Sequence, residues 1–345
     1  MDKLRMPLIF HRCGWFLIVL FLGSLSFPFV LPAEVPISPI WSIQFSPDGT
    51  QLAVGTYQWI QLWDLKAKAV IKDFEPHAGA MRCLEFSGDG KTLFAGGGLP
   101  SQEGEVRIWN VETAELIDAL SPHGDTIEAI AVSDDDSKLL TASMDAAGVV
   151  ISLSDREVTE TLTQHVGRIL AIDYRADGKY FATGSEDKSV KVWNPQTYEV
   201  LVSFDLNDDA VYTVSFSPEE NIVVSGSADN AIRSWRIIES RRESGEIRTE
   251  GALNRVYNGH QGPIYSVDCG IRNNQVIFVS GSADALVIVW NLRSGNQEYN
   301  FNQSTDEVYA VDLSPDGQFV AAGGRDGIAR IWSLADGSLI AELKQ

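Results

Sequence analysis

The stretch from His165 to Asn194 consists of short apolar runs separated by polar turn residues. Ile169–Tyr174 and Val190–Trp193 are rich in β-branched and aromatic side chains, which favour strands. Asp177-Gly178 interrupts the runs, and a further run, Tyr198–Phe204, follows. The pattern predicts a meander of four strands in about 40 residues. Such a sheet has two faces to cover, so it needs copies of itself as neighbours.

The pattern recurs along the chain, most visibly through a tryptophan near the end of the third apolar run. Successive positions are 46, 44, 40, 42, 55 and 42 residues apart, close to one repeat period with a single exception. A turn such as Ser46-Pro47-Asp48-Gly49 also recurs between the first two runs. The repeated positions hold Trp63, Trp109, Leu153, Trp193, Trp235, Trp290 and Trp332.

On these residues the chain resembles the WD40-repeat β-propeller family from about Ile37 to the end, although only Trp63-Asp64 keeps the literal Trp-Asp pair. The resemblance implies an all-β fold, a seven-bladed propeller of four-stranded antiparallel blades. We expect an N-terminal segment at 1–33 and a propeller at 36–345. The expected blades are 36–76, 77–122, 123–164, 165–206, 207–259, 260–303 and 304–345.

The ends of the propeller predict how the ring closes. Leu339–Leu343 supplies a fourth strand to the last unit, and the first unit begins its own first strand at Ile40. We therefore predict closure by side-chain packing, without a shared strand. Between these ends, Glu239–Asn254 is rich in Arg, Glu, Ser and Gly and is interpreted as a mobile loop. Gly96-Gly97-Gly98 is interpreted as a flexible joint.

The first 33 residues differ in kind from the rest. Lys3, Arg5 and Arg12 precede an uncharged stretch that is apolar at its centre and then broken by small residues and prolines. This predicts a secretory signal, with the mature protein outside the cytoplasm, secreted or periplasmic. The alternative is membrane anchoring by residues 13–33, because 21 uncharged residues could just span a bilayer. Pro28 argues against a full-length spanning helix.

The charge of the chain narrows the class of partner. The net charge is −20, and because residues 1–33 carry +2, the remainder carries −22. A surface this acidic repels phosphate backbones, so we expect no nucleic-acid partner. The acidity is also what solubility alone would require.

The histidines receive structural roles from the resemblance. In the family, a His that opens a unit joins a network with a Ser or Thr of the second strand, an Asp of the next turn, and the Trp. His77, His123, His165 and His260 open units, and units one and two have incomplete sets, so we expect them to be looser or held by packing alone. The complete sets are His165, Thr183, Asp187 and Trp193, and His260, Ser280, Asp284 and Trp290.

This assignment leaves no histidine outside the N-terminal segment for general-base work or a metal site. The Asp-Gly pairs are hairpin turns rather than calcium loops, because their spacing does not fit such a loop. Cys83 and Cys269 lie in first strands on nearly opposite sides of the expected ring, too far apart for a disulfide. We expect no catalytic residue, no metal and no cofactor.

The resemblance also implies a partner-binding face, formed by the loops between units and those joining second and third strands. In each unit, two positions early in the first strand, three and five residues after the position that opens the unit, are expected to point to this face at the channel mouth. The first of these positions includes Arg168 and Glu307. An aromatic arc beside a charged rim is typical of protein-binding hot spots, although aromatic side chains can also simply fill such a mouth. The candidate residues are Trp41, Arg82, Glu128, Leu170, Tyr212, Tyr265 and Tyr309, with Arg168 and Arg325 nearby.

These observations favour a non-catalytic scaffold that binds a protein or peptide, with the propeller itself monomeric and any membrane contact made through an uncleaved N-terminal segment. The alternative is a propeller enzyme of the lactonase, lyase or glycosidase type, using channel-mouth carboxylates or a central metal. A sensor domain of a larger periplasmic complex is a third reading, which the sequence does not separate from the first.

Overall fold

The computed structural model describes residues 38–57, 59–75, 79–242 and 247–344. The predictions for the N-terminal segment and for His77 lie outside these residues. Within them the chain is all-β: every regular element is a strand, so no helix is present that could cross a membrane. The strands form seven sheets, and each sheet contains four strands that are antiparallel and neighbours in sequence. The predicted seven-bladed propeller of four-stranded blades is confirmed.

The first four blades contain sixteen strands. Blade one has β1 (Ser42–Phe45), β2 (Gln51–Gly55), β3 (Ile60–Asp64) and β4 (Ala69–Phe74). Blade two has β5 (Ala80–Phe86), β6 (Thr92–Leu99), β7 (Glu103–Asn110) and β8 (Leu116–His123). Blade three has β9 (Ile127–Val132), β10 (Lys138–Ser143), β11 (Gly148–Ser152) and β12 (Val158–Leu162). Blade four has β13 (Ile169–Tyr174), β14 (Phe181–Ser185), β15 (Val190–Trp193) and β16 (Val200–Phe204).

The remaining three blades complete the ring. Blade five has β17 (Val211–Phe216), β18 (Ile222–Ser227), β19 (Ile232–Arg241) and β20 (Ile247–Tyr257). Blade six has β21 (Ile264–Arg272), β22 (Gln275–Ser282), β23 (Val287–Asn291) and β24 (Gln297–Phe301). Blade seven has β25 (Val308–Leu313), β26 (Phe319–Gly324), β27 (Ile328–Ser333) and β28 (Leu339–Lys344).

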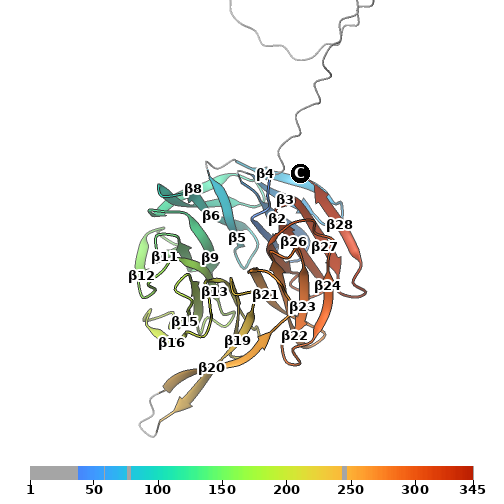
Figure 1. Ribbon diagram of the computed structural model, residues 1–345. Helices are drawn as coiled ribbons and strands as arrows, with labels where there is room; N and C mark the ends of the chain where they lie inside the picture. Colours follow the sequence, from blue (N-terminus) through green and yellow to red (C-terminus); the bar gives the residue numbers. More distant parts are fainter. Residues whose placement is uncertain (1–37, 58, 76–78, 243–246, 345) are drawn as a thin grey trace, which may run out of the picture. The chain divides into compact units, whose positions relative to one another are not determined.

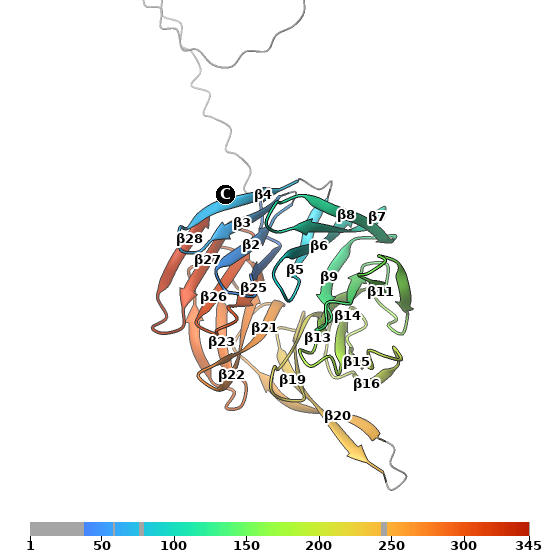
Figure 2. The ribbon, with the colours of Figure 1, turned by 180° about the vertical axis from the view of Figure 1, so that it is seen from behind.

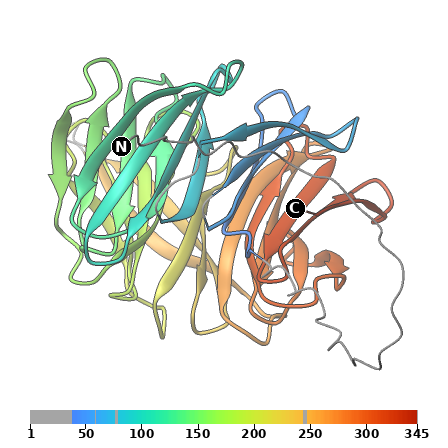
Figure 3. The same ribbon diagram turned by 90° about the horizontal axis from the view of Figure 1, so that it is seen from above.

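The position of a strand in its blade decides its burial. First strands such as β5, β9, β13 and β21 lie nearest the centre, and fourth strands such as β4, β8, β12 and β20 lie at the rim (Figures 1 and 2). Turned by 90°, the sheets of successive blades pack face to face (Figure 3). Both faces of a second strand are therefore covered, and β14 and β18 are buried at every residue. Rim strands keep exposed positions, as in β12.

Neighbouring blades approach closely because second strands carry glycine where the next blade's first strand packs. A Cβ added to Gly281 of blade six would lie 2.7 Å from Val308 and 2.8 Å from Val311 of blade seven. A Cβ added to Gly323 of blade seven would lie 2.5 Å from Ile40, just before the first strand of blade one. The same contact is thus repeated across the closure of the ring.

Closure between blades seven and one uses both packing and hydrogen bonds. Ile40, Phe45 and Leu343 share one buried apolar cluster. The Ile40 N–H donates to the Gly324 carbonyl at 2.9 Å. In the described part of the chain, the sheet of blade seven is β25-β26-β27-β28. Closure without a shared strand stays a prediction, because an added strand would come from residues that lie outside the described part. The prediction was incomplete in naming side-chain packing alone.

The interpretation of Glu239–Asn254 as a mobile loop is wrong. Apart from 243–246, which the structure does not describe, this stretch lies in β19 and β20, which pair from Ile232–Tyr257 out to Arg241–Ile247. The resulting hairpin projects from the rim (Figures 1 and 2). Glu239 holds the hairpin against blade four, because its carboxylate accepts hydrogen bonds from Lys179 Nζ, at 2.7 Å, and from the Tyr180 hydroxyl. Backbone pairing and this anchor outweigh a composition that resembles disorder.

The interpretation of Gly96-Gly97-Gly98 as a flexible joint is also wrong. All three glycines belong to β6 and pair with Val106, Glu105 and Gly104 of β7. A Cβ on Gly96 would lie 2.7 Å from Cys83 Sγ and 2.8 Å from Ile127. The glycines therefore permit close approach inside a sheet rather than bending.

At five of the seven junctions between blades, a side chain in the channel connects one first strand to the next. Each of these side chains accepts a backbone N–H from the first strand of the following blade. Asp312 Oδ2 lies 2.6 Å from Phe45 N, so this contact also spans the closure. The other donor–acceptor pairs are Phe86 N with Gln44, Phe216 N with Asp173, Cys269 N with Ser215, and Leu313 N with Asp268.

The carboxyl groups of this channel prefer to be protonated. Burial raises the pKa of Asp173 to about 7 and that of Glu85 to about 8. Burial also raises the pKa values of Asp268 and Asp312, and for Asp312 the neighbouring Asp268 carboxylate adds to the shift. All four side chains are only half-buried by surface area, since they line the channel, so channel water limits the effect.

These shifts predict a stability that falls as pH rises. A carboxyl whose folded pKa exceeds its unfolded pKa binds more protons in the native state, so its contribution is full at low pH and is lost between about pH 5 and about pH 8. We expect the melting temperature to decline over this window. The combined substitutions Asp173→Asn, Asp268→Asn and Asp312→Asn keep a carbonyl acceptor for each N–H and should flatten the decline. An unchanged pH slope in the triple variant, measured by thermal melts, would contradict this assignment.

Candidate functional site

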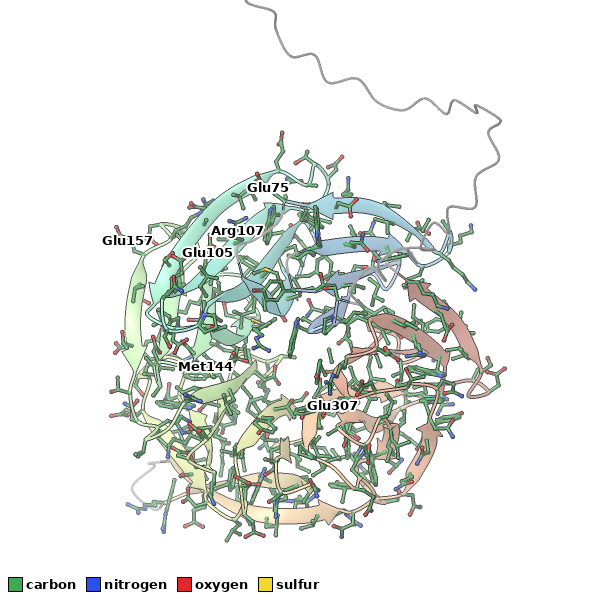
Figure 4. The ribbon with its side chains drawn as sticks, turned by 45° about the horizontal axis from the view of Figure 1, so that its top comes forward. Glu75, Glu105, Arg107, Met144, Glu157 and Glu307 are labelled. Atoms are coloured by element: carbon green, nitrogen blue, oxygen red, sulfur yellow. The ribbon has the colours of Figure 1, made fainter. Side chains whose placement is uncertain are left out.

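Side chains from all seven blades meet in one cavity of about 390 Å³ at the mouth of the channel. We call it the channel-mouth cavity. Its lining includes every one of the seven first-strand positions that the sequence predicts. Met144 and Glu307 also line it and reach the mouth from opposite sides of the central opening (Figure 4). The lining residues are Trp41, Arg82, Glu128, Met144, Leu170, Tyr212, Tyr265, Glu307 and Tyr309.

A repeated irregularity of the first strands places these side chains. In blade six, Ile264 pairs with Ser282 and Ser266 with Gly281, so Tyr265 is an extra residue between two consecutive pairs. Such a β-bulge interrupts the ladder and re-aims the side chain of the unpaired residue. The same shift leaves Arg82, Glu128, Leu170, Tyr212 and Tyr309 unpaired in blades two, three, four, five and seven. Periodicity in the sequence does not reveal these bulges.

The aromatic residues of the cavity form a continuous arc. The rings of Tyr212 and Tyr265 are 5.7 Å apart, and Tyr265 meets Tyr309 edge to face at 5.4 Å. Tyr309 stacks on Trp41 with 4.7 Å between centroids and 4° between planes. Contacts of this kind stabilise a rigid surface, because each ring is held by its neighbour.

The opposite end of the arc is closed by an ion pair. The Arg82 guanidinium lies 4.1 Å from the centroid of the Trp41 ring, a cation–π contact, and 3.6 Å from Glu128 Oε1. The Trp41 indole nitrogen is shielded from solvent, and no described residue accepts its hydrogen. Burial raises the pKa of Glu128, and Arg82 opposes that shift.

Glu307 sets the electrostatics of the tyrosine side. Its carboxylate accepts a hydrogen bond from the Tyr309 hydroxyl at 2.8 Å. Burial and this hydrogen bond raise the pKa of Tyr309 to about 12. Burial, followed by the charge of Glu307, raises the pKa of Tyr265. The tyrosine side of the cavity therefore has a negative potential.

The structure does not bring Arg168 and Arg325 into this cavity. Arg168 lies 3.8 Å from Glu186, and Arg325 lies 3.7 Å from Asp306. Both arginine side chains are at least half exposed, so these pairs contribute little to stability. They belong to the outer rim.

The sequence reasoning missed exposed apolar side chains around the mouth. Tyr57 and Trp59 flank the turn between β2 and β3 and are 50% and 49% exposed. Val166, in the connection into blade four, is 93% exposed. Turns between second and third strands and connections between blades lie on one face, because successive strands alternate in direction. The sequence did contain a signal for them: Tyr-Gln-Trp stands at residues 57–59, between the second and third strands, where other units have an Asp.

The histidine networks have a common geometry in three blades. His165 Nδ1 lies 2.8 Å from Asp187 Oδ2, and His165 Nε2 lies 2.7 Å from Thr183 Oγ1. The Trp193 indole N–H donates to the same hydroxyl at 2.8 Å. The corresponding contacts join His260, Asp284, Ser280 and Trp290. A third set, His123 with Thr141 and Asp145, lacks only the tryptophan.

Arginine replaces histidine in two blades, which the sequence did not suggest. In blade five, the buried Arg233 lies 2.7 Å from Asp229 and also donates to Asn207. In blade seven, Arg330 lies 2.6 Å from Asp326. Each arginine is four residues after its aspartate, a spacing that could have marked it.

Blades one and two depart from both arrangements. The indole nitrogens of Trp63 and Trp109 are buried, and neither has a hydrogen-bond partner among the described residues. Blade two contains an ion pair between Glu105 and Arg107 at 3.1 Å (Figure 4). Packing is therefore not the only interaction that holds blade two.

Cys83 and Cys269 are free thiols and partly buried. Within the described ranges, no three or more His, Cys, Asp and Glu side chains are grouped so as to hold a metal ion.

The fold, the repeats and the networks define the class as a WD40-repeat propeller, and the comparison with known sequences agrees. The chain matches the family described as WD domain, G-beta repeat at residues 34–64, 68–110, 156–194, 199–236, 251–291 and 295–333. These segments cover more than half of the chain, so the protein belongs to this family. The unmatched stretch contains most of blade three, where Leu153 replaces the tryptophan.

Three curated relatives illustrate the similarity. The small ribosomal subunit protein RACK1y of Oryza sativa subsp. japonica is 34% identical over 95 residues, 28% of each chain. The guanine nucleotide-binding protein subunit beta of Arabidopsis thaliana is 36% identical over 81 residues, 24% of this chain and 21% of the relative. The small ribosomal subunit protein RACK1 of Caenorhabditis elegans is 40% identical over 65 residues, 19% of this chain and 20% of the relative. The matches thus span between 20% and 28% of these relatives.

The histidine network of blade four predicts that loss of the Thr183 hydroxyl group destabilises the protein. Thr183→Val keeps the shape but leaves the Trp193 N–H without its acceptor and the Nε2 atom of His165 without its partner, which should cost about 1–3 kcal/mol of unfolding free energy. Thr161→Val, at an exposed position of β12, is the matched control and should change little. Denaturant unfolding measures both. Equal losses in the two variants would show that the network is not what stabilises blade four.

Proposed function

We propose that this protein is a non-catalytic scaffold that binds a protein or peptide partner at the channel-mouth cavity. One observation carries the proposal: bulges in six first strands direct side chains of different blades into the same cavity. The side chains placed there are mainly tyrosine, tryptophan and arginine, the types that dominate binding hot spots.

The relatives support the same kind of role. Their names describe subunits, of the small ribosomal subunit and of a guanine nucleotide-binding protein, and a subunit acts through contact with other chains. The similarity covers only part of each relative, so the partner of this chain is not inferred from theirs. The acidic propeller favours a protein partner over nucleic acid.

The channel carboxylates do not favour the alternative of a propeller enzyme. Asp173, Asp268 and Asp312 each accept a backbone N–H of the following blade. Glu85 accepts a hydrogen bond from the Gln44 side chain at 2.8 Å. These contacts support a role in joining blades.

We also propose that the propeller acts outside the cytoplasm, either free or anchored by residues 13–33. The support is the sequence of the first 33 residues alone, with its basic start and apolar centre. N-terminal sequencing of the mature protein should begin after residue 26 or 33. A mature chain that begins at Met1 in a cytoplasmic fraction would contradict the proposal, and a full-length chain found only with membranes would favour the anchor.

The partner site predicts a loss of binding without a loss of fold. Trp41→Ala combined with Tyr309→Ala removes the stacked pair at one end of the arc and should abolish capture of a partner from the native envelope fraction. The melting temperature should change by only a few degrees, at roughly 2–4 °C per kcal/mol for a protein of this size. Tyr198→Ala, in the turn between β15 and β16 on the other face, is the control. Capture that survives the double substitution would refute the site.

A further inference from the structure

The two halves of the channel-mouth cavity differ in charge balance. On one side, Arg82 and Glu128 lie 3.6 Å apart and neutralise one another. On the other side, Glu307 accepts a hydrogen bond from Tyr309 but has no cation within ion-pair distance among the described residues. Glu307 is only partly buried, so its carboxylate is accessible to a cation that enters from outside the cavity.

The surroundings of Glu307 suit a cation. The rings of Tyr212, Tyr265 and Tyr309 form the wall beside it, and aromatic faces attract ammonium and guanidinium groups. After burial, Glu307 is the main group that raises the pKa values of Tyr265 and Tyr309, and Arg325 opposes both shifts. At longer range residues 34–345 carry a net charge of −22, which steers cationic partners towards the propeller.

The shape of the cavity points to an inserted side chain rather than to a flat contact. Its volume is about 390 Å³, within the range of sites that enclose a ligand group. Leu170 and Met144 supply apolar wall that could cover the aliphatic stem of a long basic side chain, whose charged head would remain at Glu307. Exposed Trp59 and Val166 lie on the same face, outside the cavity, where the rest of a bound segment would pass.

Resting on the function proposed above, we infer that the channel-mouth cavity takes a basic side chain, lysine or arginine, from an exposed segment of the partner protein, with Glu307 as its counter-ion and the tyrosine arc as its wall. Arg82 is already engaged with Trp41 and Glu128 and holds that end of the cavity closed. Glu307 is therefore the residue that decides the charge of the side chain admitted.

The test uses the full chain and four capped Gly-Ser peptides that differ only in a central arginine, lysine, citrulline or glutamate. Fluorescence anisotropy of the labelled peptides measures affinity at several salt concentrations. The arginine and lysine peptides should bind, their affinity should fall as salt rises, and the uncharged citrulline and acidic glutamate peptides should bind at least about tenfold more weakly. Equal binding of arginine and citrulline peptides, preference for glutamate, or no binding of any peptide would overturn the inference.

Variants locate the binding. Glu307→Gln keeps an acceptor for the Tyr309 hydroxyl and should weaken binding of the arginine peptide about tenfold or more. Glu157→Gln, on the rim of blade three, removes the same charge far from the cavity and should have no effect (Figure 4). Tyr265→Phe should retain binding and Tyr265→Ala should lose it, because the ring is what contacts the cation. If Glu307→Gln and Glu157→Gln had equal effects, the overall charge of the propeller would explain the binding, and the inference would be refuted.

Two controls separate this inference from the proposed function. Free arginine amide that competes as well as the peptide would show a small-cation site instead of a protein-docking site, and would overturn the inference. Partner capture by Glu307→Gln is measured beside capture by the Trp41→Ala, Tyr309→Ala variant. If only the double variant loses the partner and no basic peptide binds, the scaffold function stands and the basic side chain is refuted. If neither loses the partner, both are refuted.

Discussion

Contact between each blade and the next is the constraint on which this structure depends. A four-stranded meander exposes two faces and buries them only between neighbours, so no blade is stable without the ring. Two devices repeat this contact: a second-strand glycine that admits the next blade, and a first-strand side chain that accepts its backbone N–H. Both recur between blades seven and one, where they join the two ends of the described ring.

The same contact explains why the blades tolerate different polar networks. The interiors of different blades hold different polar groups. Blade four has His165 with Asp187, blade five has Arg233 with Asp229, and blade two has a buried Trp109 indole nitrogen with no hydrogen-bond partner among the described residues. Packing between blades stabilises all three, so the networks adjust local stability without determining the fold. Blade three illustrates the point, because it keeps four strands and a His123 network although Leu153 replaces the tryptophan.

The channel-mouth cavity arises where this packing ends. Below the cavity, side chains of the first strands contact the neighbouring blades. At the bulge, the extra residue has no partner in the strand ladder, so its side chain can serve another role. A rigid ring of strands thereby holds variable side chains at fixed positions. Tyr309 stacked on Trp41 and Arg82 paired with Glu128 show that neighbouring blades also organise the site.

The sequence alone determined the number of blades, their strand order and the candidate positions around the mouth, because hydrophobic period, turn residues and repeat length are local properties.

The sequence did not determine the features that depend on pairing between distant segments. The charged composition of Glu239–Asn254 suggested disorder, whereas cross-strand pairing and the Glu239 anchor to Lys179 made a hairpin. Three consecutive glycines suggested a joint, whereas close packing against Cys83 and Ile127 placed Gly96 in a strand. The bulges, the lone carboxylate of Glu307 and the exclusion of Arg168 from the cavity likewise followed from register and contacts between blades. Only the closed ring brings those groups together, since they lie on different blades.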